Sequence, residues 1–251
     1  MSGHSKWSSI KHQKGAADAR RGQLFTKLTR EIMVAVREGG SSPDTNFRLR
    51  LAVQRARDGS MPSENIERAI KRGSGELGGE ILHEMTLEGY GPGGAAIMVK
   101  ALSDNRNRTI QEVRNIFTRG GGSLGESGCV AWIFDLKGLI TINTDSLDTE
   151  ELSLRAIDAG AEDVIPGDGY VEIYTKADEL EVVRGALEGQ NVSIASAEQS
   201  LIPKSTIRLD EKAALQLLRL MDKLEALDEV QQVCSNVDFP DDLLEKYQSQ
   251  C

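Results

Sequence analysis

The stretch 162-EDVIPGDGYVEIYT-175 contains two strand-like runs, residues 162–166 and 169–175, which follow each other closely. Working outward, each run is flanked by a segment with helical periodicity and then by another strand-like run. These flanking elements are strands near 138–143 and 191–199 and helices near 148–159 and 177–188. The order β-α-β-β-α-β is that of the ferredoxin-like fold, so we expect residues 136–204 to form one such domain.

The segments on both sides of residues 136–204 contain the elements of a second α/β domain. Residues 81–135 lack the last helix and strand of a complete sandwich, and that pair follows after residue 204. The expected elements are strands at 81–88, 95–102, 129–134 and 229–237 and helices at 105–118 and 207–227. We therefore expect residues 81–135 and 205–240 to form one domain, into which residues 136–204 are inserted.

Residues 1–75 are predicted to form a basic helical domain, in which an arm, residues 1–22, precedes three helices. The helices are expected near 23–38, 43–58 and 63–72, and Ser42 is expected to cap the second, with Pro43 at its first position. The predicted fold class is α+β and multidomain: an N-terminal three-helix bundle with a basic arm, followed by two ferredoxin-like α/β sandwich domains, one inserted in the other.

The composition excludes several classes of protein. Apolar residues make up 39% of the 251 residues, as in a folded protein, and no apolar run approaches the ~18–20 residues that cross a bilayer. The first residues contain no apolar stretch typical of a signal peptide. Cys129, Cys234 and Cys251 are scattered, which fits a reducing compartment and no disulfide framework. We expect a cytoplasmic protein with no membrane partner.

Charge is distributed very unevenly along the chain. Residues 1–72 hold 15 Lys/Arg and 7 Asp/Glu, a net charge of +8, whereas residues 73–251 hold 15 and 32, a net charge of −17. Such segregation predicts a polyanionic partner for the basic part. The alternative is a solvated charge pattern with no partner.

Several sequence patterns match catalytic or cofactor motifs, but their context excludes the chemistry. Gly89-x-Gly91-x-x-Gly94 precedes a strand instead of a helix, so it predicts a hairpin turn and not a dinucleotide-binding loop. Gly121-x-Ser123-x-Gly125 resembles a nucleophile elbow, but His4, His12 and His83 all lie upstream of it. The cysteines and histidines match no metal-ligand spacing. We expect a non-enzyme with no catalytic residue, no metal site and no cofactor.

Lys and Arg side chains gain affinity for nucleic acid by displacing counterions from phosphates. The expected phosphate contacts lie in the arm and on the first helix: Lys6, Lys11, Lys14, Arg20, Arg21, Lys27 and Arg30. Two further arm residues, Trp7 and His12, are expected at bases or sugars, although Trp7 could equally anchor the arm to the bundle. The third helix offers a weaker candidate for base contacts in Asn65, Arg68, Lys71 and Arg72.

Seven motifs along the chain resemble those of the YebC/PmpR family. They are Gly3-His-Ser-Lys-Trp7, Ile10-Lys-His12, Phe25-Thr-Lys27, Asn65-Ile-Glu-Arg-Ala-Ile-Lys-Arg-Gly73, Glu88-Gly-Tyr-Gly-Pro-Gly-Gly94, Asp104-Asn-Arg-Asn-Arg-Thr109 and Gly120-Gly-Gly-Ser-Leu-Gly125. The family includes probable bacterial transcriptional regulators and is related to the mitochondrial translational activator of cytochrome c oxidase. The resemblance implies a three-domain protein without known catalytic activity, cast either as a DNA-binding regulator or as a ribosome-associated factor.

Three functions follow as expectations. The first is a non-catalytic, DNA-binding transcriptional regulator that acts as a monomer or weak oligomer through residues 1–72. The second keeps the same basic surface but binds ribosomal RNA or tRNA and relieves stalled translation, because phosphate contacts carry no base information. The third is a protein–protein adaptor that uses the Gly91–Gly94 turn or the acidic sheets.

Overall fold

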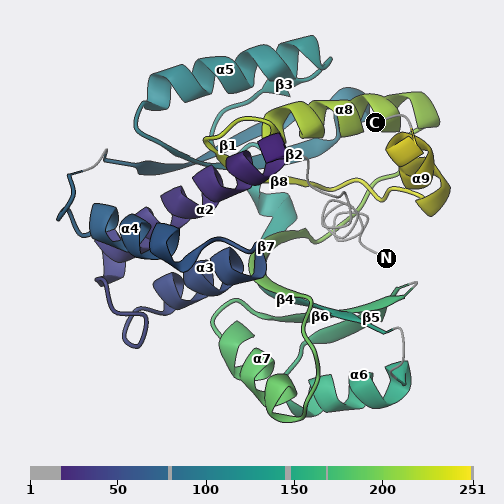
Figure 1. The fold of residues 1–251 in the computed structure, drawn as a ribbon. Coiled ribbons are helices and arrows are strands. Elements are labelled where there is room, and N and C mark those ends of the chain that lie inside the picture. The colour runs from purple at the N-terminus through teal and green to yellow at the C-terminus, as the bar shows by residue number, and fades with distance from the viewer. Residues whose placement is uncertain (1–17, 79–80, 145–147, 168, 250–251) are drawn as a thin grey trace. The chain divides into compact units, whose positions relative to one another are not determined.

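The computed structural model describes residues 18–78, 81–144, 148–167 and 169–249. The chain divides into two compact units (Figure 1). Residues 134–204 form one, here called the inserted unit, and the segments up to residue 133 and from residue 205 onward form the other, here called the main unit. In the described residues, no helix combines the length and apolarity needed to cross a bilayer.

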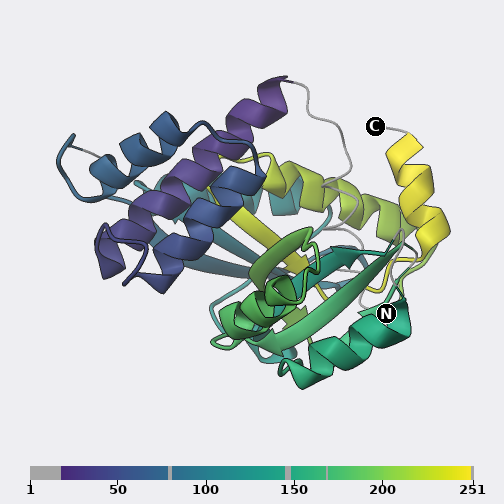
Figure 2. The ribbon, with the colours of Figure 1, turned by 60° about the horizontal axis from the view of Figure 1, so that its bottom comes forward.

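The main unit begins with a bundle of three helices, seen best in Figure 2: α2 (Asp18–Gly39), α3 (Phe47–Asp58) and α4 (Ser63–Gly73). Its core joins branched side chains such as Ile32 and Leu49 with several small residues that let the helices approach closely. Gly73 marks the tightest approach, because a Cβ there would lie 2.8 Å from the Val36 side chain. The three helices expected from the sequence are confirmed.

The cap of α3 differs from the prediction. Asn46, not Ser42, is the N-cap residue: its Oδ1 accepts a hydrogen bond from the Leu49 amide at 3.0 Å. Its Nδ2 also donates to the carbonyl oxygens of Ala35 and Gly40, at 2.7 and 2.8 Å. The buried side-chain amide of Asn46 therefore bonds backbone groups at both the start of α3 and the end of α2. A serine hydroxyl four residues earlier could not do this.

The main unit continues with a four-stranded antiparallel sheet in the order β3-β1-β2-β8. Its strands are β1 (His83–Tyr90), β2 (Ala96–Ser103), β3 (Ser123–Leu124) and β8 (Val230–Ser235). The associated helices are α5 (Arg106–Arg119), α8 (Glu211–Glu225) and α9 (Asp241–Ser249), with short 3-10 turns at Pro92–Gly94 and Ala131–Ile133. Because β1 lies between β2 and β3, the segment β2-α5-β3 is a split β-α-β unit, as in a ferredoxin-like sheet.

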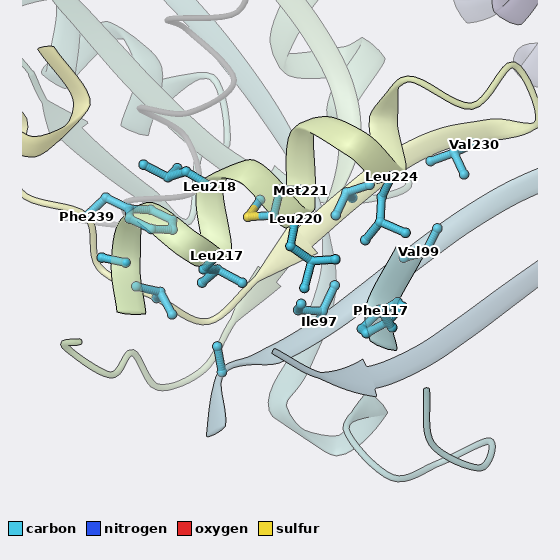
Figure 3. Packing of buried hydrophobic residues seen from close by; sticks show 14 of the residues in the cluster. Ile97, Val99, Phe117, Leu217, Leu218, Leu220, Met221, Leu224, Val230 and Phe239 are labelled. Carbon is cyan, nitrogen blue, oxygen red and sulfur yellow. The ribbon is translucent and has the colours of Figure 1, made fainter. Parts of the chain in front are cut away.

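The core of this domain lies between one face of the sheet and the helices α5 and α8 (Figure 3). Alternate residues of β2, Ile97 and Val99, point to this side, where they meet Phe117 of α5 and Leu220 and Leu224 of α8. All five side chains are almost completely buried. Helices from before and after the inserted unit thus share one core.

The strand expected at 129–134 is not present, and this prediction is wrong. Residues 131–133 form a 3-10 turn, and the short edge strand is β3, in the glycine-rich segment 120–125. The physical reason is Glu88, whose carboxylate accepts hydrogen bonds from the amides of Gly128, Val130 and Ala131. Those amides are therefore not available to a strand ladder.

The inserted unit has the ferredoxin-like order β5-β6-β4-β7. Its elements are β4 (Phe134–Asn143), α6 (Thr149–Asp158), β5 (Asp163–Pro166), β6 (Tyr170–Lys176), α7 (Leu180–Gly189) and β7 (Ser196–Pro203). At Gly138 the sheet and α7 come so close that a Cβ would lie 2.2 Å from Thr175 Oγ1 and 2.9 Å from the Leu180 side chain. The predicted fold class, a helical bundle followed by two α/β sandwiches, one inserted in the other, is confirmed.

Candidate nucleic-acid interface

Most residues predicted to touch nucleic acid lie in the arm. Lys6, Trp7, Lys11, His12 and Lys14 lie outside the described residues. Arg20 belongs to α2, but its side chain is not among those described. The structure therefore places three of the predicted side chains, all on α2.

Of these three, only Arg21 is exposed and unpaired among the described residues. Lys27 Nζ donates a hydrogen bond to the carbonyl oxygen of Glu225 at 2.5 Å. Arg30, whose side chain is 18% exposed, lies 3.6 Å from the Glu229 carboxylate and also donates to the Leu102 carbonyl at 3.4 Å. Lys27 and Arg30 thus dock α2 against the sheet domain of the main unit instead of facing solvent.

Glu229 is the centre of this docking network. Its carboxylate also receives a hydrogen bond from Arg108 at 3.2 Å, and the same guanidinium bonds Asp104 at 2.7 Å. Burial alone would raise the pKa of Asp104, but the charge and hydrogen bonds of Arg108 outweigh it and lower that pKa. Asn105 caps α5 by accepting the Arg108 amide. The Asp104–Thr109 motif is therefore a helix cap joined to the docking network.

Two of the four arginines of α3, Arg48 and Arg55, are also engaged within the fold. Arg48 donates to Glu38 at 2.5 Å and to Glu84 of β1 at 3.0 Å, and Arg55 bonds both carboxylate oxygens of Glu31. Burial lowers the pKa of Arg48, but Glu84 and Glu38 more than offset this and raise it. These cations join the helices to each other and to the sheet, and they contribute little positive charge to the surface.

Among the described residues, six exposed cations of the bundle form neither an ion pair nor a side-chain hydrogen bond. They are Arg21, Arg37, Arg57, Arg68, Lys71 and Arg72, here called the bundle cations. The exposed Arg50 also forms no ion pair within the described part of the chain, but it donates to the carbonyl oxygens of Pro43 and Asp44. Arg37 and Arg57 were not selected from the sequence, although both fall outside the apolar stripe of their helices. Together with the arm, the bundle cations are the candidate interface.

The fold and this interface define a class of protein. It is a multidomain α+β protein in which a basic helical bundle is followed along the chain by two α/β sandwich domains. Family models match nearly the whole chain. The TACO1/YebC protein N-terminal domain matches residues 5–76, and the TACO1/YebC second and third domain matches residues 82–237. The chain therefore belongs to the TACO1/YebC family, which confirms the resemblance seen in its motifs.

Similar proteins extend over the full length. The chain is 62% identical over 250 residues to a probable transcriptional regulatory protein of Dehalococcoides mccartyi (strain CBDB1), with 100% of both chains covered. It is 51% identical over 251 residues to a probable transcriptional regulatory protein of Herpetosiphon aurantiacus, again with full coverage. The crystal structure of the conserved hypothetical protein Aq1575 from Aquifex aeolicus matches with a TM-score of 0.86 and 50% identity, covering 92% of this chain and 96% of that one.

Proposed function

We propose that the chain is a non-catalytic regulator of gene expression that binds DNA through residues 1–72. The observation that carries this proposal is the net charge of +8 on this segment against −17 on the remainder. The exposed, unpaired state of the bundle cations supports it. A phosphate that binds such a cation displaces only water and counterions and breaks no ion pair of the protein. The relatives' name, probable transcriptional regulatory protein, supports transcription as the process.

The proposed contacts differ from the sequence expectation in two residues. Lys27 and Arg30 are assigned to docking, since a phosphate contact by either would break its bonds to the sheet domain. Lys6, Lys11, Lys14, Arg20 and Arg21 stay as proposed phosphate ligands, with Trp7 and His12 at bases or sugars. Five phosphate contacts contribute about −4.5 to the slope of log K against log salt on duplex DNA.

The test is a salt titration of the full chain on a fluorescein-labelled 40-base-pair duplex. The variant K6Q/K11Q/K14Q/R20Q/R21Q removes the five arm-side cations, and a control, R155Q/K176Q/K204Q/R208Q/K246Q, removes five cations elsewhere. We expect the slope of log K against log salt to be smaller in magnitude by about 4.5 for the first variant than for wild type. The control variant is expected to keep the wild-type slope. A wild-type slope near zero, or equal slopes for the two variants, would overturn the proposal.

A second measurement separates DNA from ribosomal RNA as the physiological partner. Crosslinking in cells followed by sequencing of bound DNA and bound RNA is expected to enrich promoter DNA. Cosedimentation of the chain with ribosomal subunits, together with enrichment of ribosomal RNA only, would replace transcription by translation as the regulated process. An adaptor function would instead show binding to a protein partner that survives high salt.

A further inference from the structure

Helices α5 and α8 carry an unusual share of the positive charge in the acidic part of the chain. They hold 7 of the 15 Lys/Arg of residues 73–251 but only 4 of the 32 Asp/Glu, a net charge of +3. The other residues of that part hold 8 Lys/Arg and 28 Asp/Glu, a net charge of −20. The two helices are therefore a local exception in an acidic sequence.

The solvent side of α5 presents only cationic, amide and hydroxyl side chains. Its buried side is formed by Thr109, Val113 and Phe117, and Glu112, the helix's only carboxylate, is half-buried at the margin. The exposed residues over the body of the helix are Asn107, Gln111, Arg114, Asn115, Thr118 and Arg119. At 1.5 Å per residue this row is about 18 Å long, which corresponds to about five phosphates of one strand at ~3.4 Å each.

The solvent side of α8 has the same chemistry. Lys212, Gln216, Arg219 and Lys223 are exposed, and their spacing of four, three and four residues places them in one row. The carboxylates of α8 lie off this row: Glu211 pairs with Lys246 of α9 at 3.0 Å. Asp222 accepts a hydrogen bond from the Tyr247 hydroxyl of α9.

The two rows lie on neighbouring helices over the same face of the sheet (Figures 1 and 3). Near the C-terminal end of α5 the helices touch: Gln216 Nε2 donates to the Gly120 carbonyl at 3.0 Å. A Cβ on Gly120 would lie 2.7 Å from Leu220 Cδ1, so glycine permits this approach. Arg114, Arg119, Lys212, Arg219 and Lys223 form no ion pair among the described residues.

We propose that this α5–α8 face is a second nucleic-acid contact surface of the chain. This inference rests on the proposed function. It adds that a single nucleic acid molecule contacts the chain at two places, residues 1–72 and the α5–α8 face. The cations meet phosphates, while Asn107, Gln111 and Asn115 offer donors and acceptors to sugars and base edges. A surface that binds an acidic protein needs only cations. The amide side chains that lie among the cations here therefore favour nucleic acid as the ligand.

The test uses the full chain and a four-fold variant of the face, R114Q/R119Q/R219Q/K223Q. Glutamine keeps helix propensity, and far-UV circular dichroism checks that the variant is folded. The control R155Q/K176Q/K204Q/R208Q changes the net charge equally at sites away from the two helices. On the 40-base-pair duplex, loss of four phosphate contacts reduces the salt slope by about 3.6, and the control variant keeps the wild-type slope. A 40-nucleotide RNA hairpin, measured in parallel, shows which backbone the face prefers.

The outcomes separate this inference from the proposed function. Equal slopes for the face variant and its control overturn the inference, while the loss caused by the arm variant still supports the proposed function. An unchanged slope for the arm variant beside a reduced one for the face variant overturns the proposed site but supports the face. Binding of poly-glutamate that is as tight as binding of the duplex, and is lost in the face variant, overturns the assignment to nucleic acid.

Discussion

Replacing Glu88 by glutamine tests whether one buried carboxylate organises the loop between the main sheet and the inserted unit. Glu88 is 5% exposed, and its two oxygens accept the amides of Gly128, Val130 and Ala131 at 2.7, 2.9 and 2.8 Å. Glutamine keeps one acceptor oxygen and turns an NH₂ group toward the remaining amide. Hydrogen bonds to a charged acceptor are each worth ~1.5–3 kcal/mol, so E88Q is expected to lower the free energy of unfolding by about 2–4 kcal/mol at pH 7.

The effect of E88Q on the free energy of unfolding is expected to depend on pH in a defined direction. Burial alone would raise the pKa of Glu88, but the three amide hydrogen bonds outweigh it and lower that pKa below its ordinary value. A lowered pKa in the folded state stabilises the protein above the unfolded pKa of ~4.3, and this stabilisation is lost as pH falls through the folded pKa. The difference between wild type and E88Q should therefore shrink below about pH 4.

Urea unfolding at pH 7 and pH 3.5 measures the free energy, and hydrogen exchange of the 128–131 amides localises the effect. The indole of Trp132 donates to the Cys129 carbonyl at 3.1 Å, so its fluorescence in a W7F background reports on the same loop. The matched control is E126Q, since Glu126 is an exposed carboxylate of this loop. If E88Q and E126Q both stay within ~0.5 kcal/mol of wild type at pH 7, the assigned role of Glu88 is wrong.

Three further substitutions test contacts inside the main unit and inside the inserted unit. Asn46→Ala removes a buried cap and two more hydrogen bonds, so urea unfolding should show a loss of ~2–3 kcal/mol, whereas S42A should change it by under ~0.5 kcal/mol. Glu229→Gln removes the charge that two arginines share and should cost ~1–3 kcal/mol; an unchanged rate of exchange along α2 would contradict the docking role. Gly138→Ala puts a Cβ 2.2 Å from Thr175 Oγ1 and should destabilise the inserted unit by more than ~2 kcal/mol, partly restored in G138A/T175A.

The inserted unit could be predicted from sequence because its strands and helices follow local periodicity. The strand at 129–134 could not, because its backbone amides are taken by a carboxylate about forty positions earlier in the chain. Nothing in the local pattern of 129–134 marks those amides as already bonded. The error thus arises where a long-range polar contact overrides strand propensity.

The same limit applies to the candidate interface. Helical periodicity places Lys27 and Arg30 away from the apolar stripe of α2, which suggests solvent. Their partners, the Glu225 carbonyl and the Glu229 carboxylate, lie about 200 residues further along the chain. The α5–α8 face was missed for a related reason: each row is visible in the sequence, but the inserted unit separates the two helices, and only the fold places them side by side.

The division of charge between the two units explains how an acidic chain can offer two cationic surfaces. The inserted unit, residues 134–204, holds 5 Lys/Arg and 15 Asp/Glu, a net charge of −10, while the rest of the chain holds 25 and 24, a net charge of +1. The overall charge of −9 is thus a property of the inserted unit alone. In the main unit, carboxylates such as Glu229, Glu84 and Glu31 pair with cations inside the fold, while the bundle and the α5–α8 face carry cations that form no ion pair among the described residues. Because the acidic excess lies in the inserted unit, the isoelectric point of 5.0 for the whole chain does not describe the main unit, which carries both proposed surfaces.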